Sequence, residues 1–588
     1  MKQAWGRYFS RNPETGVKRA SAEVFSAEAP VRQPLLALQQ SFPQASAQLQ
    51  QAAQEAEQAL GDAVLLEFVL ESDNLSHTAR PLPRSPQAAC KIAVALVLEG
   101  LLTPEQAILR IEPEDLRAML APALEDGAQE ALAQGRPLVP GAASGRIVLT
   151  ADEALAAADP VILLCERLGY AQRKALHRLE GLIVRSGAAL AARHLECPCL
   201  QLDQIQLEAG QRVSLDGGTG RLYAGDLPVG GGLLSADACT LLEWAAPLVP
   251  LEIRANVSGL EEARLASAWG AQGIGLFRIE GIVLHPRRLP LFQTVLHQVC
   301  QQQLPDSPDY EQLVRELTGD IVELLDATQG PFNIRLLDSP LAQMLDFWQA
   351  SSELPEDYFA GRLGDWLLEL NPMQGLRCGR LSLLYPRLLE IQLRGILGAW
   401  KDTRRRLQVM LPGTCDAQEI VHFRQCLKKV AAELSCPLPE VGSMLEIPRA
   451  CLLAEELAEQ ADFLSFGTGD LTEATCGISR YDAPISFLPH YLSQGIFERD
   501  PFEAIDQRGV GALMRIASQQ VKARCPSVEI GTCGAQAVDP ESLQFCMQLG
   551  LNYVSVPTRH LPVARLAAAQ TTLRSGSPRH PLPRLRRN

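Results

Sequence analysis

The chain has 588 residues, of which 47% are hydrophobic and 21% charged, a composition typical of a globular protein with a sizeable core. Its formal net charge of −14 argues against a general nucleic-acid-binding surface. No apolar run reaches the roughly 18 residues that a membrane span needs, so we expect neither nucleic acid nor membrane as a partner.

At about 150 residues per domain, the length predicts three to five domains. The fifteen cysteines are scattered and show no paired CxxC spacing of the kind that holds zinc. Because the sequence also shows no secretory signal, we expect reduced thiols in a cytoplasmic protein.

Two parts are predicted before residue 136. The stretch RNPETG (Arg11–Gly16) predicts a turn between two short strands, and the glutamine- and alanine-rich residues 45–60 predict a long helix. Apolar positions at helical spacing in residues 85–120 predict a small helical module. We therefore expect one domain at residues 1–84 and a helical linker module at 85–135.

A compact α/β unit is predicted at residues 136–228, framed by glycine-punctuated strands in LVPGAASGRIVLTADEA and QRVSLDGGTGRLYAGD. Between them, GLIVRSGAALAARHLECPCL runs from a strand through Ser186-Gly187 into an alanine-rich helix. Such a turn is a common place for a reactive group or an anion, yet it offers one serine and no better nucleophile. The glycine-rich stretch that begins at residue 229 predicts a linker over 229–250.

Short buried strands then alternate with helical segments, which predicts parallel βαβ units and a (β/α)₈ barrel over residues 251–572. The basic, proline-rich residues 573–588 predict a disordered tail. Eight strand candidates are visible, namely EIRANV, GIGLF, FNIRLLD, LQVML, VGSMLEI, DFLSFG, VEIGTC and NYVSV.

Polar residues follow these strands, at the end of the barrel where active sites lie. Glu446 and Asp470 are 24 positions apart, about one βα repeat, so both can face the same mouth. Two carboxylates with room for water and ligand oxygens suit Mg²⁺ better than zinc. The other residues of interest at the strand ends are Asn256, Arg278, Glu280, Arg335, Asp338, Cys533 and Gly534.

Arg278 and Arg335 can each bind a phosphate or carboxylate with paired hydrogen bonds, and the thiol of Cys533 can supply a proton. Taken singly, each arginine also fits a salt bridge, and Cys533 also fits a small core residue. Their convergence on one rim favours a site for an anion and a metal ion.

Several of the same stretches carry a resemblance to a known family. GIGLFRIE, NPMQGLRCGR, SMLEIPRA, FLSFGTGDLTEATCGISRYD, DPFEAIDQRGVGALM and YVSVPTRHLPVARLAAAQ closely resemble the barrel of pyruvate phosphate dikinase. They resemble phosphoenolpyruvate synthase and enzyme I of the sugar phosphotransferase system less closely. Residues 138–226 look like the family's swivelling phosphohistidine domain, and residues 1–84 look like a remnant of its ATP-grasp domain.

The resemblance implies a barrel that binds phosphoenolpyruvate or pyruvate with Mg²⁺, or alternatively Mn²⁺, and a homodimer formed through the barrel. It assigns Mg²⁺ to Glu446 and Asp470 and proton transfer at the methyl carbon to Cys533. Ligand contacts implied by the resemblance are Arg278, Arg335, Asn371, Arg377, Thr468, Gly469 and Gly534.

The sequence departs from the family in three places. The family's phosphohistidine segment, Gly-Gly-x-Thr-Ser-His-Ala-Ala, is about four residues shorter here, and the histidine is missing between Gly187 and Ala188. Neither His177 nor His194 stands in its place. The ATP-grasp domain is far shorter than a complete one and shows no glycine-rich phosphate loop, so we expect no ATP site.

The third departure is in the barrel, where the family's Gly-Thr-Asn-Asp becomes GTGD with Gly469, and its Cys-Gly-Glu-His becomes CGAQ with Ala535. Three hypotheses follow. The barrel binds a 2-oxo acid and performs chemistry that needs no phosphohistidine, it is a non-catalytic ligand sensor or partner subunit, or it is half of a dikinase served by another chain.

Overall fold

The computed structural model describes residues 3–26, 35–71, 74–125, 130–157, 159–168, 172, 175, 178–186, 197–203, 205–285, 287–300, 307–341, 344, 371–403 and 405–575. The chain separates into two compact units, residues 1–250 with 565–581, and residues 251–564 with 582–588. No helix in the described ranges is both long and apolar enough to cross a membrane.

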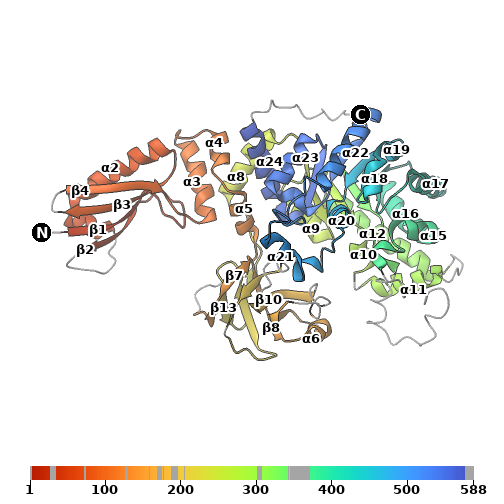
Figure 1. Ribbon diagram of the computed structural model, residues 1–588, viewed down its shortest axis with the longest axis horizontal. Helices are drawn as coiled ribbons and strands as arrows, with labels where there is room; N and C mark the ends of the chain where they lie inside the picture. The colour runs from red at the N-terminus through yellow and green to blue at the C-terminus, as the bar shows by residue number, and fades with distance from the viewer. Residues whose placement is uncertain are drawn as a thin grey trace. The chain divides into compact units, whose positions relative to one another are not determined.

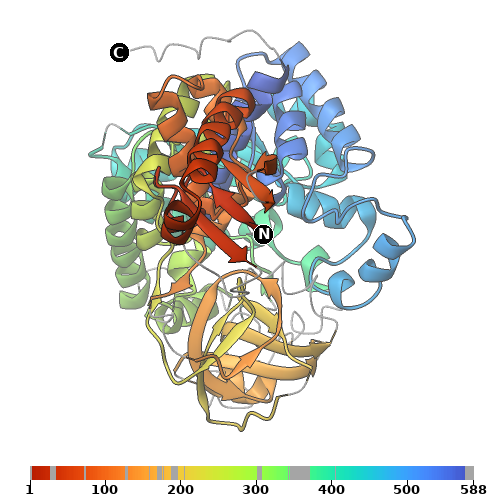
Figure 2. The ribbon, with the colours of Figure 1, turned by 90° about the vertical axis from the view of Figure 1, so that its left-hand side faces the viewer.

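The first unit opens with a four-stranded antiparallel sheet in the order β2-β1-β3-β4. Helices α1 (Leu35–Ser41) and α2 (Pro43–Leu60) pack on one of its faces, as Figures 1 and 2 show. The predicted turn at RNPETG and the predicted long helix are both confirmed. The strands are β1 (Gln3–Phe9), β2 (Ser21–Ser26), β3 (Val64–Glu71) and β4 (Asn74–Pro81).

Arg11, the first residue of RNPETG, explains why this turn is held in place. Its side chain is fully buried and donates to Glu57 of α2 at 2.9 Å and to Glu99 at 2.9 Å. A buried guanidinium needs such partners, because leaving it unpaired in the protein interior costs several kcal/mol. Arg11 therefore ties the turn to two helices.

The predicted helical module is present as α3 (Pro86–Leu98), α4 (Pro104–Leu109) and α5 (Pro113–Leu120), and α8 (Ala236–Ala245) packs on the first two. Ser85 and Thr103 cap α3 and α4, and a proline follows each cap, where its missing N–H costs nothing. Helix α24 (Leu561–Ser575) also reaches this module, because Gln570 donates to the carbonyl oxygens of Ile108 and Ile111 at 2.8 and 2.6 Å.

The first unit also contains a mixed eight-stranded sheet in the order β6-β13-β12-β8-β9-β10-β11-β7. Strand β10 (Leu179–Ser186) pairs in parallel with β9 and β11. The alanine-rich segment after it, with the predicted loss of the phosphohistidine, lies outside the described residues. The other strands are β6 (Ala133–Gln134), β7 (Arg136–Val139), β8 (Ala142–Val148), β9 (Val161–Arg167), β11 (Cys199–Gln201), β12 (Arg212–Asp216) and β13 (Arg221–Ala224), with α6 (Ala151–Ala156) beside them and a small pair β5 (Ala123–Leu124) and β14 (Val229–Gly230).

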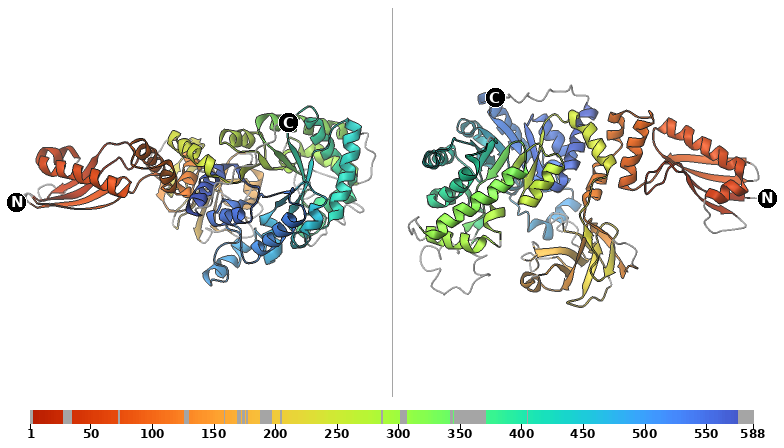
Figure 3. Two further views of the ribbon diagram at one scale, coloured as in Figure 1. Left: turned by 90° about the horizontal axis from the view of Figure 1, so that it is seen from above. Right: turned by 180° about the vertical axis from the view of Figure 1, so that it is seen from behind.

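The second unit is a closed barrel of eight parallel strands that follow one another in chain order. All eight predicted strands are confirmed. Helices cover the outside of the barrel, as Figure 3 illustrates. The strands are therefore largely buried, since their other face points into the filled interior of the barrel. The strands are β15 (Glu252–Val257), β16 (Ile274–Arg278), β17 (Phe332–Arg335), β18 (Leu407–Leu411), β19 (Glu440–Leu445), β20 (Phe463–Phe466), β21 (Glu529–Thr532) and β22 (Tyr553–Pro557).

The covering helices are amphipathic. In α17 (Ala417–Leu434), the residues Ile420, Phe423, Leu427 and Val430 recur every three or four positions and are buried, and Asp416 caps the helix. The other described helices of the second unit are α9 (Leu260–Ala268), α10 (Glu280–Val283), α11 (Leu289–Cys300), α12 (Pro308–Ala327), η4 (Pro372–Gln374), α15 (Cys378–Leu384), α16 (Pro386–Trp400), α18 (Pro448–Leu452), α19 (Ala454–Ala458), α20 (Thr468–Cys476), η5 (Ala483–Ile485), α21 (Leu488–Ser493), α22 (Val510–Arg524), η6 (Ala535–Val538), α23 (Pro540–Gln548) and η7 (Thr558–His560). The first unit also has the short helix η2 (Ala246–Leu248).

A charged network lies at the amino ends of the strands. Arg254 is almost completely buried, pairs with Glu252 at 2.7 Å and with Glu529, and lies over the ring of Tyr553 at 3.9 Å. Arg406 pairs with the same Glu529. This network joins strands β15, β21 and β22 at the end of the barrel opposite the strand termini where a site is predicted.

We expect Arg254→Ala to destabilise the barrel by about 3–5 kcal/mol, because it removes a buried guanidinium with its hydrogen bonds and leaves Arg406 as the remaining cation beside the Glu529 carboxylate. The measurement is denaturant-induced unfolding, with hydrogen exchange of β15 and β22 to assign the loss to the barrel. Arg524→Ala is the control, since Arg524 pairs with Glu459 at the surface and such pairs contribute little. Equal stability of the two variants would contradict this account of the network.

Candidate active site in the barrel

The predicted site residues meet where the strands end. Arg278 and Arg335 are the last residues of the neighbouring strands β16 and β17, and the register pairs them directly. Glu446 follows β19 and Cys533 follows β21, at the same carboxyl end of the barrel. This arrangement follows from parallel strands, which all bring their carboxyl ends to one rim.

Asp338 is the centre of the hydrogen-bond network at this rim. Arg335 Nη1 lies 2.8 Å from its Oδ2, and Arg377 Nη2 lies 2.6 Å from its Oδ1. Arg377 Nε also donates to the Asp338 carbonyl at 3.0 Å. The two guanidinium charges hold the pKa of the buried Asp338 carboxyl below its usual range.

Glu280 supports the same network from α10. Its Oε1 accepts the backbone N–H of Asp338 at 2.6 Å and lies 3.3 Å from Arg335 Nη2. Arg335 thus pairs with two carboxylates, those of Glu280 and Asp338. Its Nε is nevertheless buried without a hydrogen-bond partner among the described residues.

Arg278 differs from its neighbour because it forms no ion pair with any described residue. Its side chain remains accessible to solvent, but surrounding protein atoms desolvate it and lower its pKa, and the nearby charge of Arg335 lowers the pKa further. The guanidinium of Arg278 therefore has no direct ion-pair partner among the described residues, although the charge of Glu280 acts on it, and its hydrogen-bond donors are left for an anion.

Glu446 and Asp470 lie close enough for their charges to interact. Burial, followed by the charges of Asp338 and Asp470, raises the pKa of Glu446 to about 8. One Glu446 oxygen accepts the backbone N–H of Gly413. Asp470 receives only long contacts from guanidinium groups, at 3.4 Å from Arg377 and 3.2 Å from Arg480.

Cys533 is buried just beyond the end of β21. Its backbone N–H donates to the carbonyl of Phe466 at 3.1 Å, and its own carbonyl accepts from Asn256 Nδ2 at 3.1 Å. Asn256 therefore connects two strand ends. Burial raises the pKa of the Cys533 thiol to about 11, so the thiol is protonated near neutral pH. Cys533 also belongs to a small apolar cluster in the barrel with Met410 and Met444.

Comparison with known proteins assigns the chain to a family. Residues 234–573 match the model of the PEP-utilising enzyme, PEP-binding domain. The chain is 34% identical over 623 positions to pyruvate, phosphate dikinase 1, chloroplastic, of Arabidopsis thaliana, and the match covers 97% of this chain. It is 32% identical to the pyruvate, phosphate dikinases of Rickettsia typhi and Clostridium symbiosum, over 98% and 97% of this chain.

The chain belongs to the pyruvate phosphate dikinase family of PEP-utilising enzymes. It spans 64% of the length of the Arabidopsis enzyme and 71% of the two bacterial enzymes. The homodimer, the cytoplasmic location and the individual roles of the site residues stay predictions.

The structure shows what fills the space at Gly469, where the family motif has asparagine. A Cβ at this position would overlap Nη2 of Arg480, so the guanidinium occupies the room that a side chain would need. Arg480 also lies beside Asp470 and near Arg278. Sequence reasoning did not single out Arg480, although it stands in the quoted motif, ten positions after Asp470.

The second departure from the family motif, CGAQ, places Gln536 in a network of hydrogen bonds. The Thr468 hydroxyl lies 2.7 Å from Gln536 Oε1, and Gln536 Nε2 contacts the carbonyl oxygens of Thr468 and Pro501. A side chain at Gly534 would overlap the Thr468 hydroxyl. The Thr468 hydroxyl is therefore hydrogen-bonded within this turn, and its predicted contact with a ligand stays a prediction.

The predicted residues of NPMQGLRCGR separate in the structure. Arg377 is buried and bridges Asp338 and Asp470. Asn371 is exposed, and within the described part of the chain its side chain has no hydrogen bond to the other site residues.

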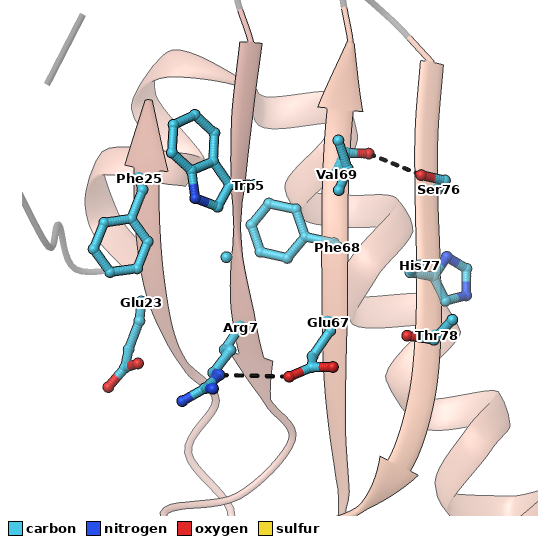
Figure 4. A pocket seen from close by; sticks show the side chains of 11 residues that line it. Trp5, Arg7, Glu23, Phe25, Glu67, Phe68, Val69, Ser76, His77 and Thr78 are labelled. Atoms are coloured by element: carbon cyan, nitrogen blue, oxygen red, sulfur yellow. Dashed lines mark hydrogen bonds and ion pairs between the residues drawn. The ribbon is translucent and has the colours of Figure 1, made fainter. Parts of the chain in front are cut away.

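A hollow of about 650 Å³ lies on the open face of the sheet formed by β1 to β4 (Figure 4). Trp5 and Phe25 stack there with ring centroids 6.4 Å apart. Arg7 is the only lysine or arginine among the lining residues, and it faces Glu67 at 3.6 Å. The hollow thus offers no unpaired lysine or arginine for a nucleotide phosphate, and the expectation of no ATP site stays a prediction.

We expect Cys533 to resist alkylation below pH 9, because its thiolate, the reactive form, accumulates only as pH approaches its raised pKa. Alkylation by iodoacetamide, followed by mass spectrometry of the peptides, should modify the exposed Cys239 first at pH 8. Labelling of Cys533 as fast as Cys239 at pH 8 would contradict the protonated, buried thiol.

Proposed function

We propose that the barrel binds phosphoenolpyruvate, pyruvate or a related 2-oxo acid together with Mg²⁺, and performs chemistry on it that needs no phosphohistidine. The observation that carries the proposal is Arg278, a desolvated guanidinium without an ion-pair partner among the described residues. Beside it, Arg335 Nε is buried without a partner. An anionic ligand would supply the acceptors that both groups lack.

The predicted metal ligands fit Mg²⁺ by their chemistry. Mg²⁺ is usually held by one or two carboxylates, with water and ligand oxygens completing the coordination. Glu446 and Asp470 supply two carboxylates, and no group of three or more metal-ligating side chains is found among the described residues. Burial, and then repulsion from Asp338 and Asp470, raises the pKa of Glu446. A divalent cation there would relieve that repulsion and supply positive charge to the ligand oxygens.

The proposed role of Cys533 is to give a proton to the methyl carbon of the ligand and to accept it in the reverse direction. Its burial supports this role, because a thiol with a raised pKa carries its proton at neutral pH. Its position at the end of β21 puts it on the same rim as Glu446 and both arginines.

A non-catalytic ligand sensor is the second candidate. It is favoured by the turn at Gly534, where Thr468 and Gln536 bond to each other. Polar groups of this turn are therefore used for packing. Proton exchange, rather than binding, separates the two candidates.

We expect oxalate, which resembles the enolate of pyruvate, to bind only when Mg²⁺ is present. Glu446→Gln should abolish the Mg²⁺-dependent binding of oxalate, because a carboxylate ligand of the metal is lost. Arg278→Gln should weaken oxalate binding by about ten- to a hundredfold, because a charged hydrogen bond to the ligand is lost. Isothermal titration calorimetry measures both effects.

Arg288→Gln is the matched control for oxalate binding, since Arg288 pairs with Glu316 and Asp320 on the helix α12 outside the strands. It should bind oxalate like the unmodified protein. Absence of Mg²⁺-dependent binding in the unmodified protein would refute the proposed function.

We expect the protein with Mg²⁺ to exchange the methyl protons of pyruvate for deuterium in D₂O, and Cys533→Ala to slow this exchange at least a hundredfold. Proton NMR follows the loss of the methyl signal, and Cys546→Ala serves as the control because Cys546 is buried in α23. Oxalate binding without any exchange would support the non-catalytic sensor instead.

A further inference from the structure

Cys378 has a backbone conformation that cysteine rarely adopts. Its φ is 57°, and Ser435, at the end of α17, is the only other described residue besides glycines with a positive φ. Left-handed backbone crowds Cβ against the neighbouring carbonyl, so it usually falls to glycine. Gly379 stands at the next position and does not take this role. An observed conformation of this kind at a candidate site calls for a reason in function.

The side chain of Cys378 has a close polar contact. Its Sγ lies 2.7 Å from Asp338 Oδ1 and donates a hydrogen bond to it. The same Oδ1 receives Arg377, and the other oxygen, Oδ2, receives Arg335. The carboxylate is therefore fixed by one donor that carries no charge and two that do.

The same side chain packs against the loop after β18, whose residue Gly413 donates a hydrogen bond to Glu446. A Cβ built on Gly413 would lie 2.5 Å from Cys378 Sγ, so the thiol lies against the Gly413 backbone. Cys378 thus touches both the residue that orients the two arginines and the residue that orients the proposed metal ligand.

An independent observation indicates that this network serves a ligand. Arg335 is more than nine-tenths buried, yet its Nε has no hydrogen-bond partner among the described residues. Arg278, its register partner on the next strand, has no carboxylate partner in the same ranges. Within the described ranges, protein groups therefore leave donors of this network unsatisfied.

We propose that Cys378 is a positioning residue of the barrel site, which holds Asp338 and Gly413 so that Arg335, Arg377 and Glu446 are in place for an anion and its metal ion. This inference rests on the proposed function, which it deepens. A glycine at position 378 would relieve the strain of the positive φ. It could neither donate a hydrogen bond to Asp338 nor fill the space beside Gly413. The thiol thus combines a neutral donor with the volume of a sulfur atom.

The test uses three variants of the full chain. Cys378→Ser keeps a donor, Cys378→Ala removes the donor and keeps the strained backbone, and Cys378→Gly removes the donor and the strain together. Cys546→Ala is the control for loss of a buried thiol elsewhere in the barrel. Each variant is measured for thermal unfolding and for the affinity of oxalate in the presence of Mg²⁺.

We expect Cys378→Gly to unfold at a temperature equal to or above that of the unmodified protein, while it binds oxalate about tenfold more weakly. Cys378→Ala should also lose about tenfold, and Cys378→Ser should recover most of the affinity. A purely structural role would lower stability and affinity together. Unchanged oxalate affinity in both the Ala and Gly variants would overturn the proposal.

A second readout does not depend on any ligand. Phenylglyoxal modifies arginines that are not held in ion pairs, and mass spectrometry of the peptides gives the rate at each position. Cys378→Ala should make Arg335 and Arg377 several-fold more reactive, with Arg288 unchanged. Unchanged reactivity of both arginines overturns the inference whether or not oxalate binds, whereas failure of oxalate to bind the unmodified protein refutes the proposed function alone.

Discussion

The rim of the barrel depends on one buried carboxylate. Asp338 accepts hydrogen bonds from Arg335, Arg377 and Cys378, and its own N–H donates to Glu280. A buried anion is tolerated only when its charge and its lone pairs are both satisfied, and here two cations and a neutral donor satisfy them. Because Arg335 comes from a strand and Arg377 from a later loop, Asp338 is where the barrel and its long insertion are joined.

The two ends of the barrel differ in how completely their charged side chains are paired. At the amino ends of the strands, Arg254 and Arg406 share Glu529, so the described charges are paired. At the carboxyl ends, Arg278 has no ion-pair partner among the described residues, and burial together with repulsion from Asp338 and Asp470 raises the pKa of Glu446. The first end contributes to stability. The second leaves charges incompletely compensated, which is how a binding site differs from a structural network.

Sequence patterns were sufficient for the barrel and for the residues that end its strands. Strand order follows from alternating buried strands and helices, and the rim then follows from parallel geometry, which is why Arg278, Arg335, Glu446 and Cys533 could be predicted together. Contacts between loops could not be predicted in this way. The position of Arg480 depends on the space left at Gly469, and the contact of Cys378 depends on a left-handed backbone that no periodicity reveals.

Arg278 and Glu446 favour ligands of opposite charge. An anion would pair with the guanidinium of Arg278, and a cation would stabilise the carboxylate form of Glu446. With both uncompensated on one rim, binding of an anion and of a divalent cation each reduces the electrostatic cost that the other must overcome. Under the proposed function, this coupling accounts for a rim that keeps an unpaired guanidinium near a group of carboxylates, although an apolar core of the same volume would be more stable.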